Sequence, residues 1–417
     1  MDLKEIGKRV ARERSHAGLT QRELAARAEL SQPTLNRIEA GERSALTAAE
    51  LDRLALALDV SLTRLTRANP VQQRIKVAAR AGGEAAEALR IATRRAEEIL
   101  SLDERMDSFA LSPEQHGEHH GVAEVATLSC TPPSESLPSE DRGRLLAGAV
   151  REKLHLGLGP VPDPAELAES SIRVDTATLA LPEGVSGFTA RDPGRDVTLI
   201  LINSADVPER QHFTLAHELG HVLFGDGEDA HVLDGTRTQA EIRCDAFARH
   251  LLAPEQGVAC WMRENSAGPP GLKECAMAAR HYGVSLMVVL IQCRRLGLLT
   301  AEGMQTMEGH TGRRLAWSFG WGPQYAAACD AASRTRPPRR ILERAIGAYR
   351  AGRIGVRAVA ALQDEDPRAT ERELTEAGIT PPQPAAPRRV DVASLIQRRA
   401  RKAEQPGSQN ADGETQG

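Results

Sequence analysis

The sequence predicts a multi-domain fold: an all-α domain at the N-terminus, an α+β domain in the middle, and a helical C-terminal extension with a disordered tail. Three observations support this. Residues 1–67 show short helical patterns with clear caps, and strand patterns between 172 and 202 precede a strongly helical segment. From residue 380 onward Pro, Gly, Ser and Gln dominate, as is typical of disorder. At 417 residues, the chain is long enough for two or three domains.

The N-terminal domain, residues 1–67, is predicted to contain four short helices and a fifth turn. Apolar residues line one face of a first helix that Gly18 ends. Thr20 and Glu23 form a capping box that opens a second helix, and Ser31 caps a third. Thr47 opens a fourth. The tight connection at 28–31 indicates a helix-turn-helix.

Residues 70–140 are predicted to be a helical spacer, up to about 109, followed by a flexible linker. Arg and Glu mix along the first part, which suits a spacer or dimerisation arm and equally a solvated linker. Four prolines interrupt residues 112–140. The cluster His116, His119 and His120 falls there without periodicity, so a loop is favoured over a metal site.

The α+β domain is predicted over residues 141–300. A helix near 141–155 opens it, and strands follow at 172–174, 185–190 and 197–202. The last strand ends just before the helical segment with the most informative motif. A helical pair at 271–298 is predicted to pack within this domain. The extension, residues 301–379, contains a further helical piece at about 339–378, and the disordered tail covers 380–417.

An H-E-x-x-H motif lies inside the apolar run from 213 to 221. On a helix His217 and His221 are four residues apart, so both imidazoles share one face and can reach one metal ion. Glu218 sits one step round from that face, where its carboxylate can act on a water molecule. The spacing predicts a metal site with an adjacent general base.

A second signal follows about twenty residues on, where Glu241 and Asp245 flank an apolar helical stripe that Pro254 ends. Catalytic zinc commonly takes two His and one Glu and leaves a fourth position for water. Glu241 suits the third ligand, and Asp245 suits the acceptor that orients a ligating histidine. Thr238 with Glu241 also forms a capping box, but the upstream motif favours the ligand. The predicted cofactor is Zn²⁺.

Two other zinc geometries are excluded by spacing. A metzincin would need Gly and His where Phe224 and Gly227 stand. A structural zinc site is normally rich in Cys, and the six cysteines contain no C-x-x-C. They are predicted to be small apolar residues in a reducing compartment.

The two motif blocks resemble the ImmA/IrrE family of bacterial metallo-endopeptidases, over roughly residues 140–300. The residues that carry the likeness are Arg210-Gln211-His212-Phe213-Thr214-Leu215-Ala216-His217-Glu218-Leu219-Gly220-His221 and Glu241-x-x-x-Asp245-x-Phe247-Ala248-x-x-Leu251-Leu252-x-Pro254. The resemblance implies His217, His221 and Glu241 as zinc ligands, Glu218 as the catalytic base, and a transcriptional repressor as the protein substrate. Two departures are His212, where the family usually has Arg, and Cys244, where Ala is common.

The N-terminal domain resembles the Cro/C1-type (Xre) DNA-binding domain over roughly residues 3–67. Gly18-Leu19-Thr20-Gln21-x-Glu23-Leu24-Ala25 and Leu35-x-x-Ile38-Glu39-x-Gly41 carry the likeness. The resemblance implies a double-stranded operator as partner, read by a possible homodimer. It places Gln32, Pro33, Thr34 and Arg37 towards the major groove and Gln21 at a phosphate. A helix-turn-helix used only for protein contacts is the alternative.

Two functions remain open on the sequence. In one, a DNA-tethered protease cleaves a repressor. In the other, a non-proteolytic DNA-binding regulator senses metal, a ligand or a partner, although a pure sensor has no need of Glu218.

The net charge of −4 shows no global basic field, and 3% aromatic residues disfavour binding to single-stranded nucleic acid. No apolar run or signal-peptide pattern indicates a membrane, so a cytoplasmic location is expected. The oxyanion-stabilising residue stays open among His231, His250, His281 and Tyr282.

Overall fold

The computed structural model describes residues 2–58, 60, 62–66, 71–78, 84–109, 130–226 and 238–382. The histidine cluster at 116–120 and tail residues 383–417 lie outside this part of the chain. The helices of the N-terminal domain are α1 (Leu3–His16), α2 (Gln21–Arg27), α3 (Gln32–Glu39), α4 (Ala48–Ala57) and α5 (Leu62–Thr66).

The predicted caps of the N-terminal domain form as expected. Thr20 and Glu23 satisfy each other's backbone N–H groups at the start of α2, and Ser31 Oγ accepts from the Thr34 N–H at 3.2 Å. Apolar residues of all five helices form one core. The predicted all-helical helix-turn-helix domain is confirmed.

The segment between this domain and the sheet is partly extended. It contains α6 (Val71–Arg74), β1 (Lys76–Ala78) and α7 (Glu84–Asp107). The prediction of two helices over 70–109, separated at Gly82-Gly83, is wrong at β1, which pairs with β3 in antiparallel register. A three-residue strand has too little sequence pattern to be recognised, because its neighbour in the sheet stabilises it.

In the described part of the chain the sheet has four strands, in the order β1-β3-β4-β2. Besides β1 these are β2 (Asp175–Leu179), β3 (Gly187–Asp192) and β4 (Val197–Asn203). β3 runs antiparallel to β1 and β4, whereas β2 is parallel to β4. The strand predicted at 172–174 begins later, because Ile172 ends a π-helical turn and Arg173 has a left-handed φ of 62°. The mixed sheet with helices confirms the predicted α+β class.

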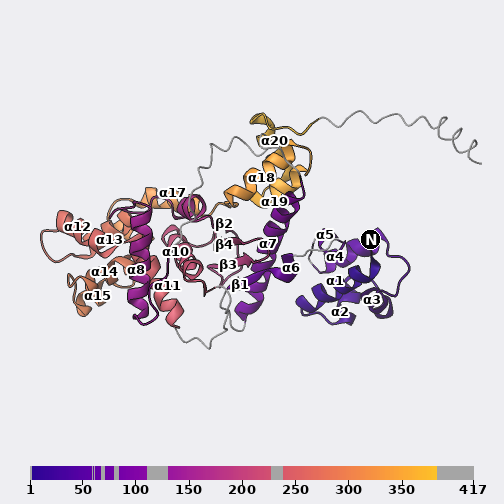
Figure 1. Cartoon of the computed structure of the whole chain (residues 1–417), viewed down its shortest axis with the longest axis horizontal. Helices are drawn as coiled ribbons and strands as arrows, with labels where there is room; N and C mark the ends of the chain where they lie inside the picture. Colours follow the sequence, from indigo (N-terminus) through magenta and orange to yellow (C-terminus); the bar gives the residue numbers. More distant parts are fainter. Residues whose placement is uncertain are drawn as a thin grey trace, which may run out of the picture.

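Alternation along the strands divides the core into two layers. Ile200 and Ile202 face one layer, which includes α8 (Ser139–Lys153), α10 (Pro208–Phe224) and α11 (Gln239–Leu252). Leu199 and Leu201 face the other, which includes α7, α18 (Arg339–Arg350) and α19 (Val356–Gln363). Figure 1 shows α7 beside the sheet and α18 to α20 (Pro367–Glu376) above it. The segments predicted as spacer and C-terminal extension therefore pack together on the second face.

The remaining helices adjoin the first layer. The pair predicted at 271–298 forms α13 (Leu272–Tyr282) and α14 (Leu286–Arg295), whose apolar residues join the same core as α10 and α11. Among the described residues no single helix is long and apolar enough to cross a membrane, although α13 and α14, bent by 111°, pass that test together. The others are α9 (Pro164–Glu166), α12 (Glu255–Asn265), α15 (Ala301–Met307), α16 (Gly312–Ser318) and α17 (Gly322–Ala332).

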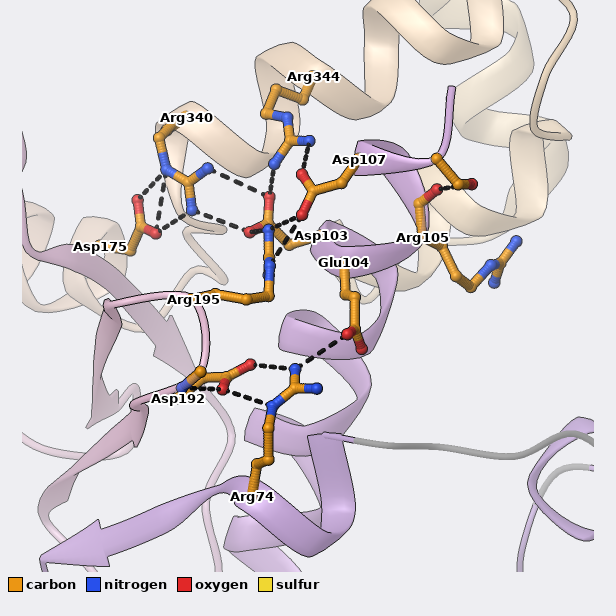
Figure 2. Close-up of polar contacts among 12 residues, drawn as sticks. Arg74, Asp103, Glu104, Arg105, Asp107, Asp175, Asp192, Arg195, Arg340 and Arg344 are labelled. Atoms are coloured by element: carbon orange, nitrogen blue, oxygen red, sulfur yellow. Dashed lines mark hydrogen bonds and ion pairs between the residues drawn. The ribbon is translucent and has the colours of Figure 1, made fainter. Parts of the chain in front are cut away.

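A network of ion pairs connects α7 and α18 of the second layer to the sheet (Figure 2). Asp103 of α7 is completely buried and pairs with Arg195, Arg340 and Arg344, the first at 2.9 Å. Arg340 also contacts Asp175 of β2 at 2.6 Å. An unpaired buried carboxylate would be very unfavourable, so these arginines are required for its burial. The network holds α7, α18 and the sheet in one arrangement.

Candidate active site

Close packing of α10 against its neighbours positions the H-E-x-x-H motif. Gly220 lies between the two histidines in sequence, and a Cβ there would be 3.1 Å from Phe247 Cδ1 of α11. A Cβ on Gly187 of β3 would be 2.7 Å from Thr214 Cγ2 of α10. Because both glycines lack a side chain, the neighbouring elements can pack more closely than any other residue would allow. As a result α10 lies within side-chain reach of both α11 and β3.

Three side chains that could together hold a metal ion converge where α10 meets α11. His217 Nε2 and His221 Nε2 are 3.1 Å apart. Glu241 Oε2 lies 3.3 Å from the first of these nitrogens, and Glu241 Oε1 lies 3.2 Å from the second. One ligand atom from each residue falls within 4.8 Å of the others. Two imidazoles and one carboxylate form a donor set that suits zinc and leaves room for a fourth ligand.

Each histidine is oriented from behind by a carboxylate. His217 Nδ1 donates to Asp245 Oδ1 at 3.0 Å, and His221 Nδ1 donates to Asp226 Oδ2 at 3.0 Å. These bonds turn both Nε2 atoms towards Glu241. Asp226 also forms an ion pair with Arg243. Sequence analysis selected Asp245 and missed Asp226, whose only signal is a carboxylate directly after the end of α10 at Gly225.

The carboxylates strongly affect the pKa of each histidine. Burial disfavours the charged form of His217, but hydrogen bonds with Asp245 and Glu241 outweigh it and raise its pKa to about 9. Burial likewise opposes protonation of His221, and Asp226 is the largest contributor that raises its pKa, to about 12. The two histidines lower the pKa of Glu241. The site therefore has a strong electrostatic preference for positive charge between these three side chains.

Glu218 lies beside this centre with one oxygen held by the sheet. Thr189 Oγ1 of β3 donates to Glu218 Oε2 at 2.7 Å. Glu218, His217 and Glu241 all line a cleft of about 1160 Å³. The cleft is larger than the 300–1,000 Å³ typical of small-molecule sites, so it has room for several residues of a peptide. Thr189 was not recognised from the sequence, because a threonine within a strand is ordinary.

The other residues singled out in this region surround the three converging side chains or lie outside the cleft. His212 lines the cleft with Nδ1 3.1 Å from the Gly283 carbonyl oxygen. Cys244 is buried, and its Sγ lies 3.8 Å from Asp226 Oδ2; His221, Asp226 and Cys244 form a second group that could hold a metal ion. Among the proposed oxyanion partners, His250, His281 and Tyr282 do not line the cleft, and Tyr282 instead donates to the Leu158 carbonyl at 3.1 Å. His231 lies outside the described residues.

The predicted DNA-reading residues are mostly available on the surface. Gln32, Pro33 and Arg37 are exposed on α3. Thr34 is half-buried, with its hydroxyl 2.7 Å from that of Ser31. Gln21 Nε2 donates to Glu39 Oε2 at 2.8 Å, so this amide is already partly engaged within the domain.

The fold and site define a helix-turn-helix protein that carries a metallopeptidase-like domain, and comparison with known proteins agrees. Residues 9–65 match the family model described as helix-turn-helix, and residues 176–294 match the IrrE N-terminal-like domain. The chain therefore combines these two domains, and both predicted family resemblances are confirmed.

Individual relatives match over part of the chain. The radiation response metalloprotease IrrE of Deinococcus radiodurans is 42% identical over 98 residues, which cover 22% of this chain and 29% of the relative. The protein of the same name from Deinococcus deserti is 35% identical over 127 residues, which cover 23% and 44%. The chain thus spans less than half the length of these curated relatives. The structure of Bacillus thuringiensis PlcR with the peptide PapR7 and DNA covers 79% of this chain and 99% of its own, at 13% identity. Its TM-score of 0.18 is too low to indicate a shared fold.

Proposed function

We propose that the protein is a DNA-binding transcriptional regulator with a zinc-dependent endopeptidase activity, which cleaves a repressor protein to control gene expression. The single observation that carries the enzymatic part is the convergence of His217, His221 and Glu241 beside Glu218. In this proposal the first three residues hold Zn²⁺ and Glu218 is the catalytic base.

The donor set fits zinc in its chemistry and in its support. Both Nε2 atoms point at the Glu241 carboxylate, and Asp245 and Asp226 fix the ring orientation through Nδ1. When bound, zinc would act as a Lewis acid that polarises the scissile carbonyl and makes water more acidic.

Glu218 can perform the proton transfers that hydrolysis needs. The bond from Thr189 engages Oε2, so Oε1 can take a proton from a water molecule in the cleft. The same carboxyl group then delivers that proton to the departing amine.

A helix-turn-helix on the same chain supports a DNA operator as the second partner. The protein would bind this operator as a homodimer, through Gln32, Pro33, Thr34, Arg37 and Gln21. Chromosomal DNA as a target implies action in the cytoplasm.

The decisive experiment replaces Glu218 with Gln, which keeps the size and one hydrogen-bond acceptor but removes the base. Zinc content and DNA binding should stay normal, while repressor cleavage in the native host should fall by a factor of about 10² or more. The matched control is Glu183→Gln, a carboxylate between β2 and β3 that does not line the cleft. If the Glu218→Gln protein still switches its target genes, the protein is a non-proteolytic regulator and the enzymatic proposal is wrong.

A further inference from the structure

The active-site cleft has a wall outside the region that matches the peptidase family. One side is the N-terminal half of α10, and another is the turn between α13 and α14. The third side is formed by residues 308–328, which include α16 and most of α17. The family match ends at residue 294, so this third side, here called the α16–α17 wall, lies outside it.

The α16–α17 wall is fixed to the peptidase domain by contacts on both of its edges. Tyr325 donates from its hydroxyl to Glu209 Oε1 of α10 at 2.8 Å. The Arg280 guanidinium of α13 lies over the Trp321 ring, 5.2 Å from its centre. The side chains of Leu315 and Trp321 are buried in the first-layer core. These contacts indicate a preformed surface of the cleft.

The surfaces that meet in the cleft are largely apolar. Val207, just before α10, and Phe213 of α10 line one side of the cleft. Met287 of α14 lines another, and Leu315 and Ala328 belong to the wall. Met287 is 40% exposed and Val207 is 42% exposed, so both keep apolar area that a bound molecule could cover. Two charged residues of the lining already have partners, since Glu209 accepts from Tyr325 and Arg280 lies over Trp321. Arg210, Glu308 and Arg313 also line the cleft. Burial of an apolar side chain against the apolar residues contributes to affinity here.

We infer that the α16–α17 wall forms a specificity pocket for a bulky apolar side chain next to the scissile bond of a peptide substrate. The inference rests on the proposed function, because it needs His217, Glu218 and Glu241 to be the reacting end of the same cleft. It adds the substrate preference and assigns it to residues beyond the family match.

Hydroxamates can test the pocket without a known substrate, because the hydroxamate group binds zinc and carries one chosen side chain into the cleft. The full-length, zinc-loaded protein is titrated calorimetrically with acetohydroxamate, N-acetyl-leucine hydroxamate and N-acetyl-aspartate hydroxamate. Burial of the leucine side chain should make the second probe bind about 10–100-fold more tightly than the first. The aspartate probe should bind more weakly than the leucine probe.

Two neighbouring substitutions on α17 separate the pocket from general effects. Ala328→Asp puts a charge into the lining, so the leucine probe should lose about 10-fold or more while acetohydroxamate binds unchanged. Ala327→Asp, at an exposed position on the same helix that does not line the cleft, should leave both affinities unchanged.

The outcomes distinguish failure of the inference from failure of the proposed function. Equal affinity for acetohydroxamate and the leucine probe, or equal effects of the two substitutions, would overturn the pocket while the metal site stands. Tight binding of the leucine probe to metal-free protein would instead show a small-molecule site unconnected to zinc. If acetohydroxamate itself does not bind, the metal site is wrong, and the inference falls with it.

Discussion

Asp226 offers the sharpest test of how the proposed metal centre is built. Asp226→Asn keeps the volume of the side chain and an oxygen that can accept from His221 Nδ1, but it removes the negative charge between His221 and Arg243. Loss of such an outer carboxylate typically reduces metal affinity or activity about 10–100-fold. The hydrogen bond of 3.0 Å is as short as that between His217 and Asp245. We therefore expect Asp226→Asn and Asp245→Asn to weaken zinc binding by similar factors.

The assay is competition for zinc with a chromophoric chelator at fixed pH and salt, together with circular dichroism to show that the fold is intact. Asp141→Asn is the matched control, because Asp141 pairs with Arg144 on the exposed side of α8 and does not contact the centre. Its zinc affinity should equal that of the unmodified protein. An Asp226→Asn protein that binds zinc as tightly as the control would refute the role of Asp226, and with it the argument that both rings are held from behind.

Three further results are expected. Gly220→Val should place a side chain against Phe247, separate α10 from α11, and lower both the unfolding free energy in urea, by about 1–3 kcal/mol, and the zinc content. Burial and nearby arginines, foremost Arg249, lower the pKa of His250 to about 3, so the unfolded state alone takes up a proton as pH falls from about 6.5 towards 3. His250 should therefore lower the stability measured by denaturation over that window, contributing at most about 1.4 kcal/mol per pH unit, and the decrease should be less steep in His250→Gln. Arg37→Ala should relax operator specificity at one base position, at a cost of about 1–3 kcal/mol in gel-shift titrations if the contact is bidentate.

Local signals were enough to predict the helix-turn-helix and the metal motif. Capping residues such as Thr20 and Ser31 act within a few positions of themselves, and the structure contains their hydrogen bonds. The spacing of His217 and His221 fixes their common face in the same local way. Glu241 could be selected because it combines a helical register with a known zinc ligand set, and it does lie against both histidines.

Features that depend on distant partners could not be predicted. Arg340 and Asp103 are 237 residues apart, and nothing near either residue indicates the other. β1 is recognisable as a strand only once β3 is present to pair with it. The layer formed by α7, α18 and α19 was hidden for the same reason, because amphipathic helices do not reveal which surface they cover.

Thr189 shows how this second layer bears on the chemistry. Its neighbours Phe188 and Ala190 point into the core shared with α7 and α18, and alternation along β3 then turns Thr189 towards α10. A shift of β3 by one residue would exchange these faces and remove the hydroxyl from Glu218. β3 is held in register by β4 on one side and by β1 on the other, where Ala78 pairs with Thr189 itself. The position of the candidate base therefore depends on packing by parts of the chain that the family match at 176–294 does not include.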